Sequence, residues 1–191
     1  VDSSSWAVTS RGSNGIYANK LLVLMDGRTL YTPLYSGVYW DLQDTDLSSI
    51  DRIEVIRGPG ATMWGSNAVN GVINIITKKA ADTQGILLTS GGGSFERGFV
   101  GVRYGGKLNE ETPFRVYAKA FSRDPMHSLS GVSVRDDWQS ARAGFRLDHS
   151  RGIDQLTVQG DVFINSIEHS LLQPTLTATF TRLDIEKKKK K

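Results

Sequence analysis

Residues 51–77 read DRIEVIRGPGATMWGSNAVNGVINIIT and hold two apolar runs of strand length on either side of a glycine-rich segment. The runs IEVI and VINII are rich in β-branched residues, which favour strands. Four glycines lie close together here: Gly58, Gly60, Gly65 and Gly71. Because glycine-rich segments between strands often cradle a phosphate, a nucleotide-binding loop is the first interpretation to test.

Neither common nucleotide signature is completed by this segment. A phosphate-binding loop needs a lysine directly after its second glycine, and here Gly60 and Gly65 have the spacing but Ser66 follows. A dinucleotide fingerprint needs a third glycine where this chain has Met63, and a helix where it has a strand. Both nucleotide readings therefore fail.

The local chemistry of the segment predicts a strand, a tight turn, one helical turn and a second strand. Pro59 and Gly60 suit the two central positions of a type II turn, and ATMW can form a helical turn that stops at Gly65. Gly71 is expected where the backbone passes close to another group. The segment holds no catalytic constellation, so it predicts no enzyme.

Residues upstream complete a small α+β domain. The continuous apolar run LLVLM at 21–25 predicts a strand that is covered on both faces. Asp26 and Gly27 then signal a tight turn. The tyrosine-rich segment that follows predicts a structured loop, and Asp46 is expected to cap a single helical turn.

Beyond residue 85 the sequence changes to strict alternation, which predicts strands with one apolar and one strongly polar face. The predicted apolar sets are Val100, Val102 and Tyr104; Phe114, Val116, Ala118 and Ala120; Gln139, Ala141, Ala143, Phe145 and Leu147; and Leu156, Val158, Gly160, Val162 and Ile164.

Two architectures share this alternation. A soluble antiparallel sheet would place its polar face in water, whereas an outer-membrane barrel places its apolar face in lipid. The connections alternate between short and long, and the strands reach about ten residues, the span of a tilted membrane strand. These two features favour the barrel. No run of 18 apolar residues is present, so no transmembrane helix is predicted.

The positive charge of the chain comes from its C-terminus. The formal net charge is +3, and residues 187–191 are all lysine, without which it would be −2. Such a tail is expected to be inert or engineered, and nucleic acid is not expected as a partner. Cysteine is absent, and His127, His149 and His169 fall in separate predicted loops, so no metal site is predicted.

Two motifs resemble the plug domain of the TonB-dependent outer-membrane receptors. The run LVLMDG is similar to a strand ending of that family, and residues 50–77 are similar to its long motif IERIEVIRGP-x3-hYG-x-x-AxGGVINIIT. Trp64 stands where the family usually has tyrosine, and Asn70 where it has glycine. The likeness covers residues 11–80 closely and residues 85–186 by alternation only.

The resemblance implies a fragment of a 22-stranded barrel closed by an N-terminal plug. Residues 1–80 would be an α+β plug that lacks its start, 81–186 the first five to six antiparallel strands, and 187–191 the tail. A full barrel needs about 220 residues in its strands alone. The energy-coupling box of the family is expected before Val1, and an isolated open sheet is expected to aggregate.

The function implied by the resemblance is active transport without chemistry on the substrate. The receptor would bind a scarce ligand in the Gram-negative outer membrane, most readily a ferric siderophore, and import it when a TonB-type protein moves the plug. A cobalamin or haem receptor and a non-transporting recognition module are the alternatives. The implied partners are an iron chelate, outer-membrane lipid and the TonB-type protein, with no cofactor.

The resemblance also assigns site residues. The two apical plug loops, 29–40 and 60–67, would contact the ligand through Tyr31, Tyr35, Tyr39, Thr62, Met63 and Trp64, while Trp40 is assigned to packing. Charged residues would dock the plug against the barrel interior: Asp51, Glu54 and Arg57 on the plug, and Arg103, Arg115, Lys119, Arg142 and Arg146 on the strands.

Overall fold

The computed structural model describes residues 6–12, 15, 18–32, 34–126, 136–167 and 175–181. Its internal contacts divide the chain into an N-terminal unit, Ser5–Lys78, and a C-terminal unit that holds Lys79–Lys191. No helix in these ranges is long and apolar enough to cross a membrane. The two units are described one at a time.

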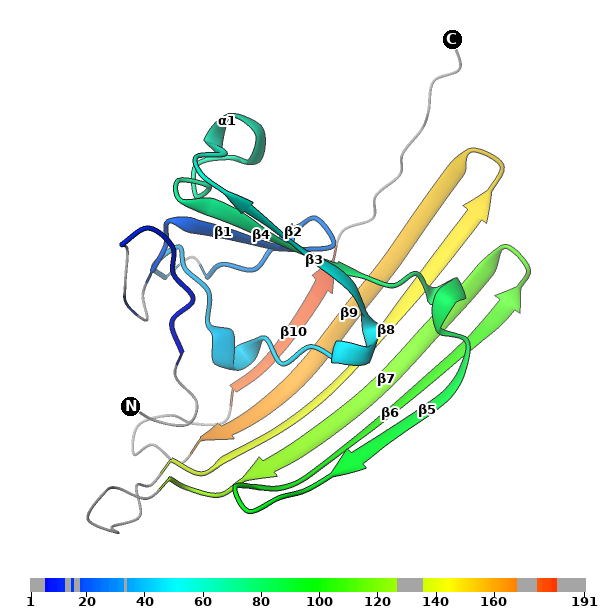
Figure 1. The fold of residues 1–191 in the computed structure, drawn as a ribbon. Helices are drawn as coiled ribbons and strands as arrows, with labels where there is room; N and C mark the ends of the chain where they lie inside the picture. The colour runs from blue at the N-terminus through cyan, green and yellow to red at the C-terminus, as the bar shows by residue number, and fades with distance from the viewer. Residues whose placement is uncertain are drawn as a thin grey trace. The chain divides into compact units, whose positions relative to one another are not determined.

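The N-terminal unit is built on a mixed four-stranded sheet with the order β2-β1-β4-β3 (Figure 1). The central strands β1 (Leu21–Met25) and β4 (Gly71–Thr77) run parallel to each other. The outer strands β2 (Arg28–Thr29) and β3 (Ile50–Arg57) are antiparallel to their neighbours. The two strands expected from IEVI and VINII are therefore β3 and β4, paired directly.

Strand β1 is covered on both of its faces, as its continuous apolar run predicts. Because successive side chains of a strand point to opposite faces, Leu22 and Val23 enter different hydrophobic clusters. The first cluster comprises Leu22, Leu24, Ala68 and Val72, with Trp64 packed against it. The second comprises Val23, Leu30, Val38 and Ile75, with Met25, Trp40, Ile50 and Ile73 packed against it.

Two acidic residues fix the turns at the edges of this sheet. Asp26 and Gly27 both have positive φ, 47° and 80°, as a type I′ hairpin turn requires. The Asp26 carboxylate accepts hydrogen bonds from the backbone N–H (2.9 Å) and the hydroxyl (2.7 Å) of Thr77. The predicted cap is also confirmed, since Asp46 accepts a 3.1 Å bond from the N–H of Ser48 at the start of η2 (Leu47–Ser49).

The connection between β3 and β4 contains the helical turn α1 (Ala61–Trp64). Gly65 ends it with φ 100°, as predicted. The type II turn predicted at Pro59 and Gly60 is wrong, because Gly60 has φ −121° and a type II turn needs positive φ there. The positive φ lies at Gly58 instead, at 113°, and the N–H of Gly60 donates to Ala68 O (2.8 Å) to close the loop.

The C-terminal unit begins with the helical turn η3 (Ala80–Thr83) and continues as one antiparallel sheet in chain order (Figure 1). Four of its strands have 12 to 14 residues, longer than the ten expected, because runs such as GGKLN extend the strand instead of forming the turn. The strands are β5 (Gly85–Gly91), β6 (Glu96–Asn109), β7 (Thr112–Arg123), β8 (Trp138–Arg151), β9 (Asp154–Ile167) and β10 (Thr175–Thr181).

The connections alternate in length as predicted. At one end of the sheet, β6 joins β7 through residues 110–111 and β8 joins β9 through residues 152–153. At the other end the connections are 92–95, 124–137 and 168–174. Short turns at one end and longer loops at the other are typical of outer-membrane barrels.

Strand register divides this sheet into an apolar face and a polar face. Val102, Ala118, Ala143 and Val162 lie in one row across four strands, and Val100, Ala120, Ala141 and Ile164 lie in the next. These rows belong to the apolar face, with the composition that the alternation predicts. The row between them, Gly101, Lys119, Arg142 and Phe163, belongs to the polar face.

Candidate functional site

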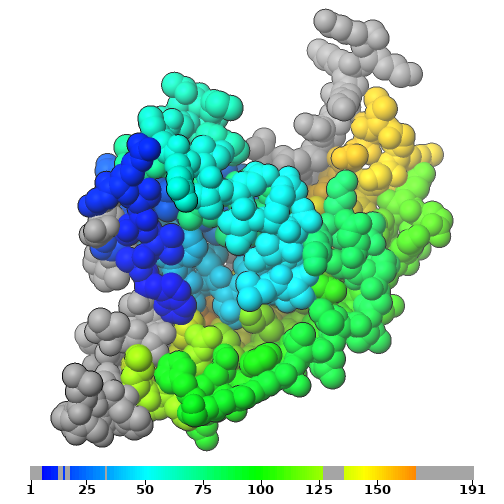
Figure 2. All heavy atoms as spheres, in the orientation of Figure 1, coloured from blue at the N-terminus to red at the C-terminus, as the bar shows by residue number. Residues whose placement is uncertain are grey.

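The two apical loops of the N-terminal unit lie side by side. The side-chain amide of Asn67 donates to the backbone oxygen of Ser36 at 3.3 Å, which joins loop 60–67 to loop 29–40. Helix α1 lies beyond the ends of β3 and β4 in Figure 1, and the same segment projects from the surface in Figure 2. The structure therefore brings the two predicted ligand loops together into one apex.

Loop 29–40 is closed by its own hydrogen bonds and presents an aromatic pair. The N–H of Thr32 donates to Gly37 O (2.7 Å), and the N–H of Ser36 donates to Thr32 O (2.9 Å). The rings of Tyr35 and Tyr39 meet edge to face with centroids 5.2 Å apart. Gly37 makes room for this arrangement, because a Cβ there would lie 2.1 Å from the Tyr35 ring.

The six predicted ligand residues differ in exposure. Met63 is 84% exposed, Tyr31 is 44% exposed, and Thr62 is also exposed. Tyr35 and Tyr39 are half-buried. Trp64 is half-buried and packs against the first core cluster, so its ring joins loop 60–67 to the core.

Neither apical loop contains a residue that is charged at neutral pH. Residues 29–40 read TLYTPLYSGVYW, and residues 60–67 read GATMWGSN. The groups that the apex can offer a ligand are therefore aromatic rings, a thioether, hydroxyls and amides. Such groups bind by apolar contact and neutral hydrogen bonds.

The acidic residues of β3 are already paired within the N-terminal unit. Arg52 donates to Asp51 (2.8 Å) and to Glu54 (2.8 Å), and Asn74 donates to Glu54 at 3.1 Å. Arg57 is exposed at the end of the strand. Arg52 was not among the predicted docking residues, although its place between two acids in DRIE was a usable signal.

The hydrogen bonds from Arg52 and Asn74 hold the pKa of Glu54 below its ordinary value of 4.5. Because the folded-state pKa is the lower one, the contribution of Glu54 to folding is complete above pH 4.5. It is lost as the pH falls through the folded-state pKa. The group is exposed, so the contribution is small.

The predicted cations of the C-terminal unit lie together on its polar face. Register places Lys119 directly opposite Arg142, and Arg115 directly opposite Arg146, while Arg103 lies opposite Tyr117. Like charges opposite each other destabilise a sheet. The polar face therefore needs anionic or aromatic compensation nearby.

Part of that compensation comes from the same sheet. Arg142 pairs with Asp161 at 2.6 Å, and its guanidinium lies 4.6 Å from the centroid of the Phe163 ring. Arg146 pairs with Asp148 at 3.0 Å. Both carboxylates fall on positions that the alternation assigns to the polar face.

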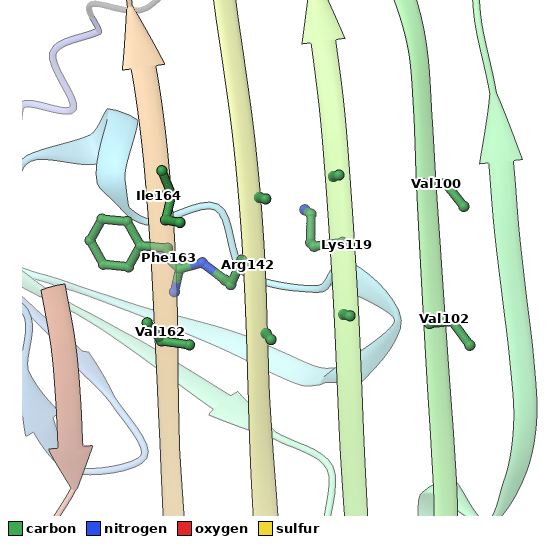
Figure 3. Close-up of a pocket in the computed structure, with 11 residues that line it drawn as sticks. Val100, Val102, Lys119, Arg142, Val162, Phe163 and Ile164 are labelled. Carbon is green, nitrogen blue, oxygen red and sulfur yellow. The ribbon is translucent and has the colours of Figure 1, made fainter. Parts of the chain in front are cut away.

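A shallow hollow of about 380 Å³ lies at the middle of the sheet (Figure 3). On the apolar face its floor is formed by four alanines between Val100 and Val102 of β6 and Val162 and Ile164 of β9. In Figure 3 the side chain of Arg142 extends from β8 toward β9 and Phe163. The alanines Ala118, Ala120, Ala141 and Ala143 make this the lowest part of the apolar face.

No cluster of three or more His, Cys, Asp or Glu residues that could hold a metal occurs in the described ranges. The prediction that His149 lies in a loop is wrong. It belongs to β8, and its Nδ1 lies 2.8 Å from the hydroxyl of Thr112. His127 and His169 lie outside the described residues.

Residues 2–72 match the family model of the TonB-dependent receptor plug domain. Residues 2–72 are a TonB-dependent receptor plug domain. This match confirms the resemblance, and together with the solved structures it confirms the fold class, a plug followed by antiparallel barrel strands. The prediction that the chain is not an enzyme agrees with it, since the relatives are receptors and transporters.

Among curated relatives, the vitamin B12 transporter BtuB of Vibrio cholerae is 32% identical over 136 residues, which is 71% of this chain. BtuB of Vibrio vulnificus is 35% identical over 80 residues, or 42% of this chain. The alignments cover 21% and 13% of those receptors. The chain therefore spans about a fifth of the length of such a receptor.

Solved structures of this family share the fold at low sequence identity. The ferric enterobactin receptor PfeA of Pseudomonas aeruginosa, in a variant form, aligns with 80% of this chain and 26% of its own (TM-score 0.57, 18% identity). The siderophore receptor PirA of Pseudomonas aeruginosa aligns with 78% and 27% (0.54, 22%). The copper transporter OprC aligns with 78% and 24% (0.52, 18%).

Proposed function

We propose that this chain is part of a Gram-negative outer-membrane receptor that binds a metal chelate and imports it when a TonB-type protein moves the plug. The observation that carries the proposal is the neutral, aromatic apex formed where loops 29–40 and 60–67 meet. The apolar face of the C-terminal unit would contact lipid, and its polar face would line the interior of the barrel.

The composition of the apex narrows the ligand class. A chelate that carries several negative charges would need cations, and neither apical loop supplies one. Tyrosine rings and a methionine side chain suit a bulky ligand with a large apolar surface. The first candidate is therefore a ferric siderophore of low net charge.

Cobalamin is the second candidate. The curated relatives described above are named vitamin B12 transporters, and one of them is 32% identical over most of this chain. Cobalamin is bulky and bears no large net charge, so it also fits a neutral apex.

Uptake by the full-length receptor, expressed in a host without receptors of its own, tests the function and the ligand together. The ligands would be a neutral ferric siderophore, a strongly anionic one and cobalamin, each radiolabelled. Energy-dependent uptake of one low-charge ligand is expected. Uptake of the anionic chelate alone would contradict the assignment of the apex, and no uptake of any ligand would favour a non-transporting recognition module.

Met63→Ala is expected to weaken ligand binding about 5- to 30-fold, equivalent to about 1–2 kcal/mol, because an exposed anchor at an interface is lost. Unfolding should not change, since the side chain is 84% exposed. Trp64→Ala should weaken both binding and stability, because this ring also packs on the core. Equilibrium binding and thermal unfolding of the purified receptor measure both, with Leu47→Ala as the exposed control. Equal affinity in all three variants would contradict the assignment of loop 60–67.

We also infer that the acids of β3 help to dock the plug in the barrel. Like charges lie opposite each other on the polar face, where Lys119 faces Arg142 and Arg115 faces Arg146. Such cations favour anionic partners in a closed interior. Asp51 and Glu54 can serve as those partners if Arg52 shares them, and Arg57 would extend the same charged surface.

Glu54→Gln in the full-length receptor is expected to loosen the plug. Cells should become several-fold more sensitive to large hydrophilic antibiotics, or lose part of their uptake, because one docking anion has been removed. Glu110→Gln is the matched control, since Glu110 is an exposed turn residue that forms a 2.9 Å ion pair with Lys107. Susceptibility and uptake equal to those of the unmodified receptor would show that β3 does not dock through this carboxylate.

A further inference from the structure

The first element of the C-terminal unit is a single helical turn that is tied to the polar face of the sheet. The N-terminal unit ends at Lys78, and η3 begins two residues later at Ala80. Ala80 is fully buried, and Thr83 is 2% exposed. A short turn on the surface of a sheet is not normally buried to this extent, so specific contacts hold it against the strands.

One tie is a hydrogen bond across 68 positions of sequence. The backbone N–H of Ala80 donates to the carboxylate of Asp148 on β8 at 2.7 Å. The same carboxylate accepts from Arg146 at 3.0 Å and from the hydroxyl of Thr157 on β9 at 2.8 Å. Asp148 is therefore held by two strands, and a hydrogen bond to such a charged group is stronger than one between neutral groups.

A second tie is steric. A Cβ built on Gly105 of β6 would lie 2.0 Å from the backbone oxygen of Thr83, so η3 rests directly on the backbone of that strand. The turn is also closed internally, because Ala80 O accepts from the side chains of Thr83 (3.2 Å) and Gln84 (2.6 Å). These contacts join η3 directly to β6 and β8, and to β9 through the Asp148 carboxylate.

The position of η3 gives these ties a mechanical consequence. A force applied to the plug passes along the chain through Lys78 and reaches η3 before β5, the strand that pairs with β6. We propose that η3, Asp148 and Gly105 form an anchor. The anchor transfers a pull on the plug to β6, β8 and β9, and it prevents that pull from separating β5 from β6. The anchor rests on the proposed function for the origin of that pull.

Single-molecule pulling tests the anchor in the full-length receptor, reconstituted in a bilayer and held by the N-terminus of its plug. In the unmodified receptor, the plug is expected to unfold under force, and the extended chain is expected to end at Lys78, where the anchor begins. Asp148→Ala and Gly105→Ala should each release the turn at 79–84 as well, which lengthens the final extension by about 20 Å. Asp148→Asn keeps an acceptor oxygen and should restore part of the unmodified behaviour.

Matched controls come from the same sheet. Asp161→Ala removes a carboxylate that pairs with Arg142, and Gly98→Ala adds a Cβ whose nearest neighbour is 3.7 Å away. In both control variants the extension should end at Lys78, as in the unmodified receptor.

Hydrogen exchange at the Ala80 amide gives a second measurement, and it should accelerate about tenfold in Asp148→Ala. Final extensions and Ala80 exchange equal to those of the unmodified receptor would overturn the anchor. Neither measurement needs the ligand or the TonB-type protein, so failure of uptake and failure of the anchor are separate results.

Discussion

Ala118→Arg is expected to reduce the folding free energy of the full-length receptor in lipid vesicles by about 2–4 kcal/mol. Ala118 is exposed on the apolar face, in one row with Val102, Ala143 and Val162. If that face contacts lipid, an arginine there places its charge in hydrocarbon without a polar neighbour. Reversible urea unfolding measures the loss.

Ser122→Arg is the matched control, because Ser122 lies on the same strand and the same face, nearer the end of β7. It is half-buried and lies opposite Gln139, where the face has become polar. The cost of a charge falls to about 0–1 kcal/mol near the membrane interface. Equal losses in the two variants would contradict a lipid-facing position for the alanines.

Leu22→Ala is expected to reduce the local stability of the N-terminal unit by about 2–5 kcal/mol, the usual cost of a cavity in a packed core. Leu22 is 5% exposed and packs with Leu24, Ala68 and Val72. Helix α1 is attached to the same cluster through Trp64, so the apex should loosen as well. Native-state hydrogen exchange of the β1 amides measures the free energy of opening.

Leu47→Ala is the control for this substitution. Leu47 is 79% exposed on the turn η2, and its truncation should change the opening free energy by less than about 0.5 kcal/mol. A Leu22→Ala effect below about 1 kcal/mol would show that β1 is not the centre of the core.

Local patterns predicted the elements that depend on neighbours in sequence. The run LLVLM is buried on both faces because it has no polar position to expose, and Asp46 caps η2 because its carboxylate reaches the N–H two residues on. Gly71 allows the close approach that was expected, since a Cβ there would lie 2.5 Å from Ile56 O. The turn at Gly60 was predicted wrongly because the nearby glycines Gly58 and Gly65 can also adopt positive φ, and in the structure they do.

The site was only partly predictable. The loops and their aromatic residues follow from the plug motif, but the edge-to-face contact of Tyr35 with Tyr39 and the packing of Trp64 depend on how the loops fold back. Arg52 was not predicted as the partner of Asp51 and Glu54. The prediction paired these two acids with cations on the strands of the C-terminal unit, whereas Arg52 lies beside them on β3.

The sequence by itself determined the family, the division of the chain into a plug part and an alternating part, and the polar and apolar faces of the strands. Those properties follow from periodicity and from a long local motif. Only the tertiary structure decided which distant residues meet: Asn67 with Ser36 across the apex, Lys119 opposite Arg142, and Asp148 with the N–H of Ala80. The physical reason is that alternation sets the face on which a side chain lies, whereas its partners depend on strand register and on contacts between elements far apart in sequence.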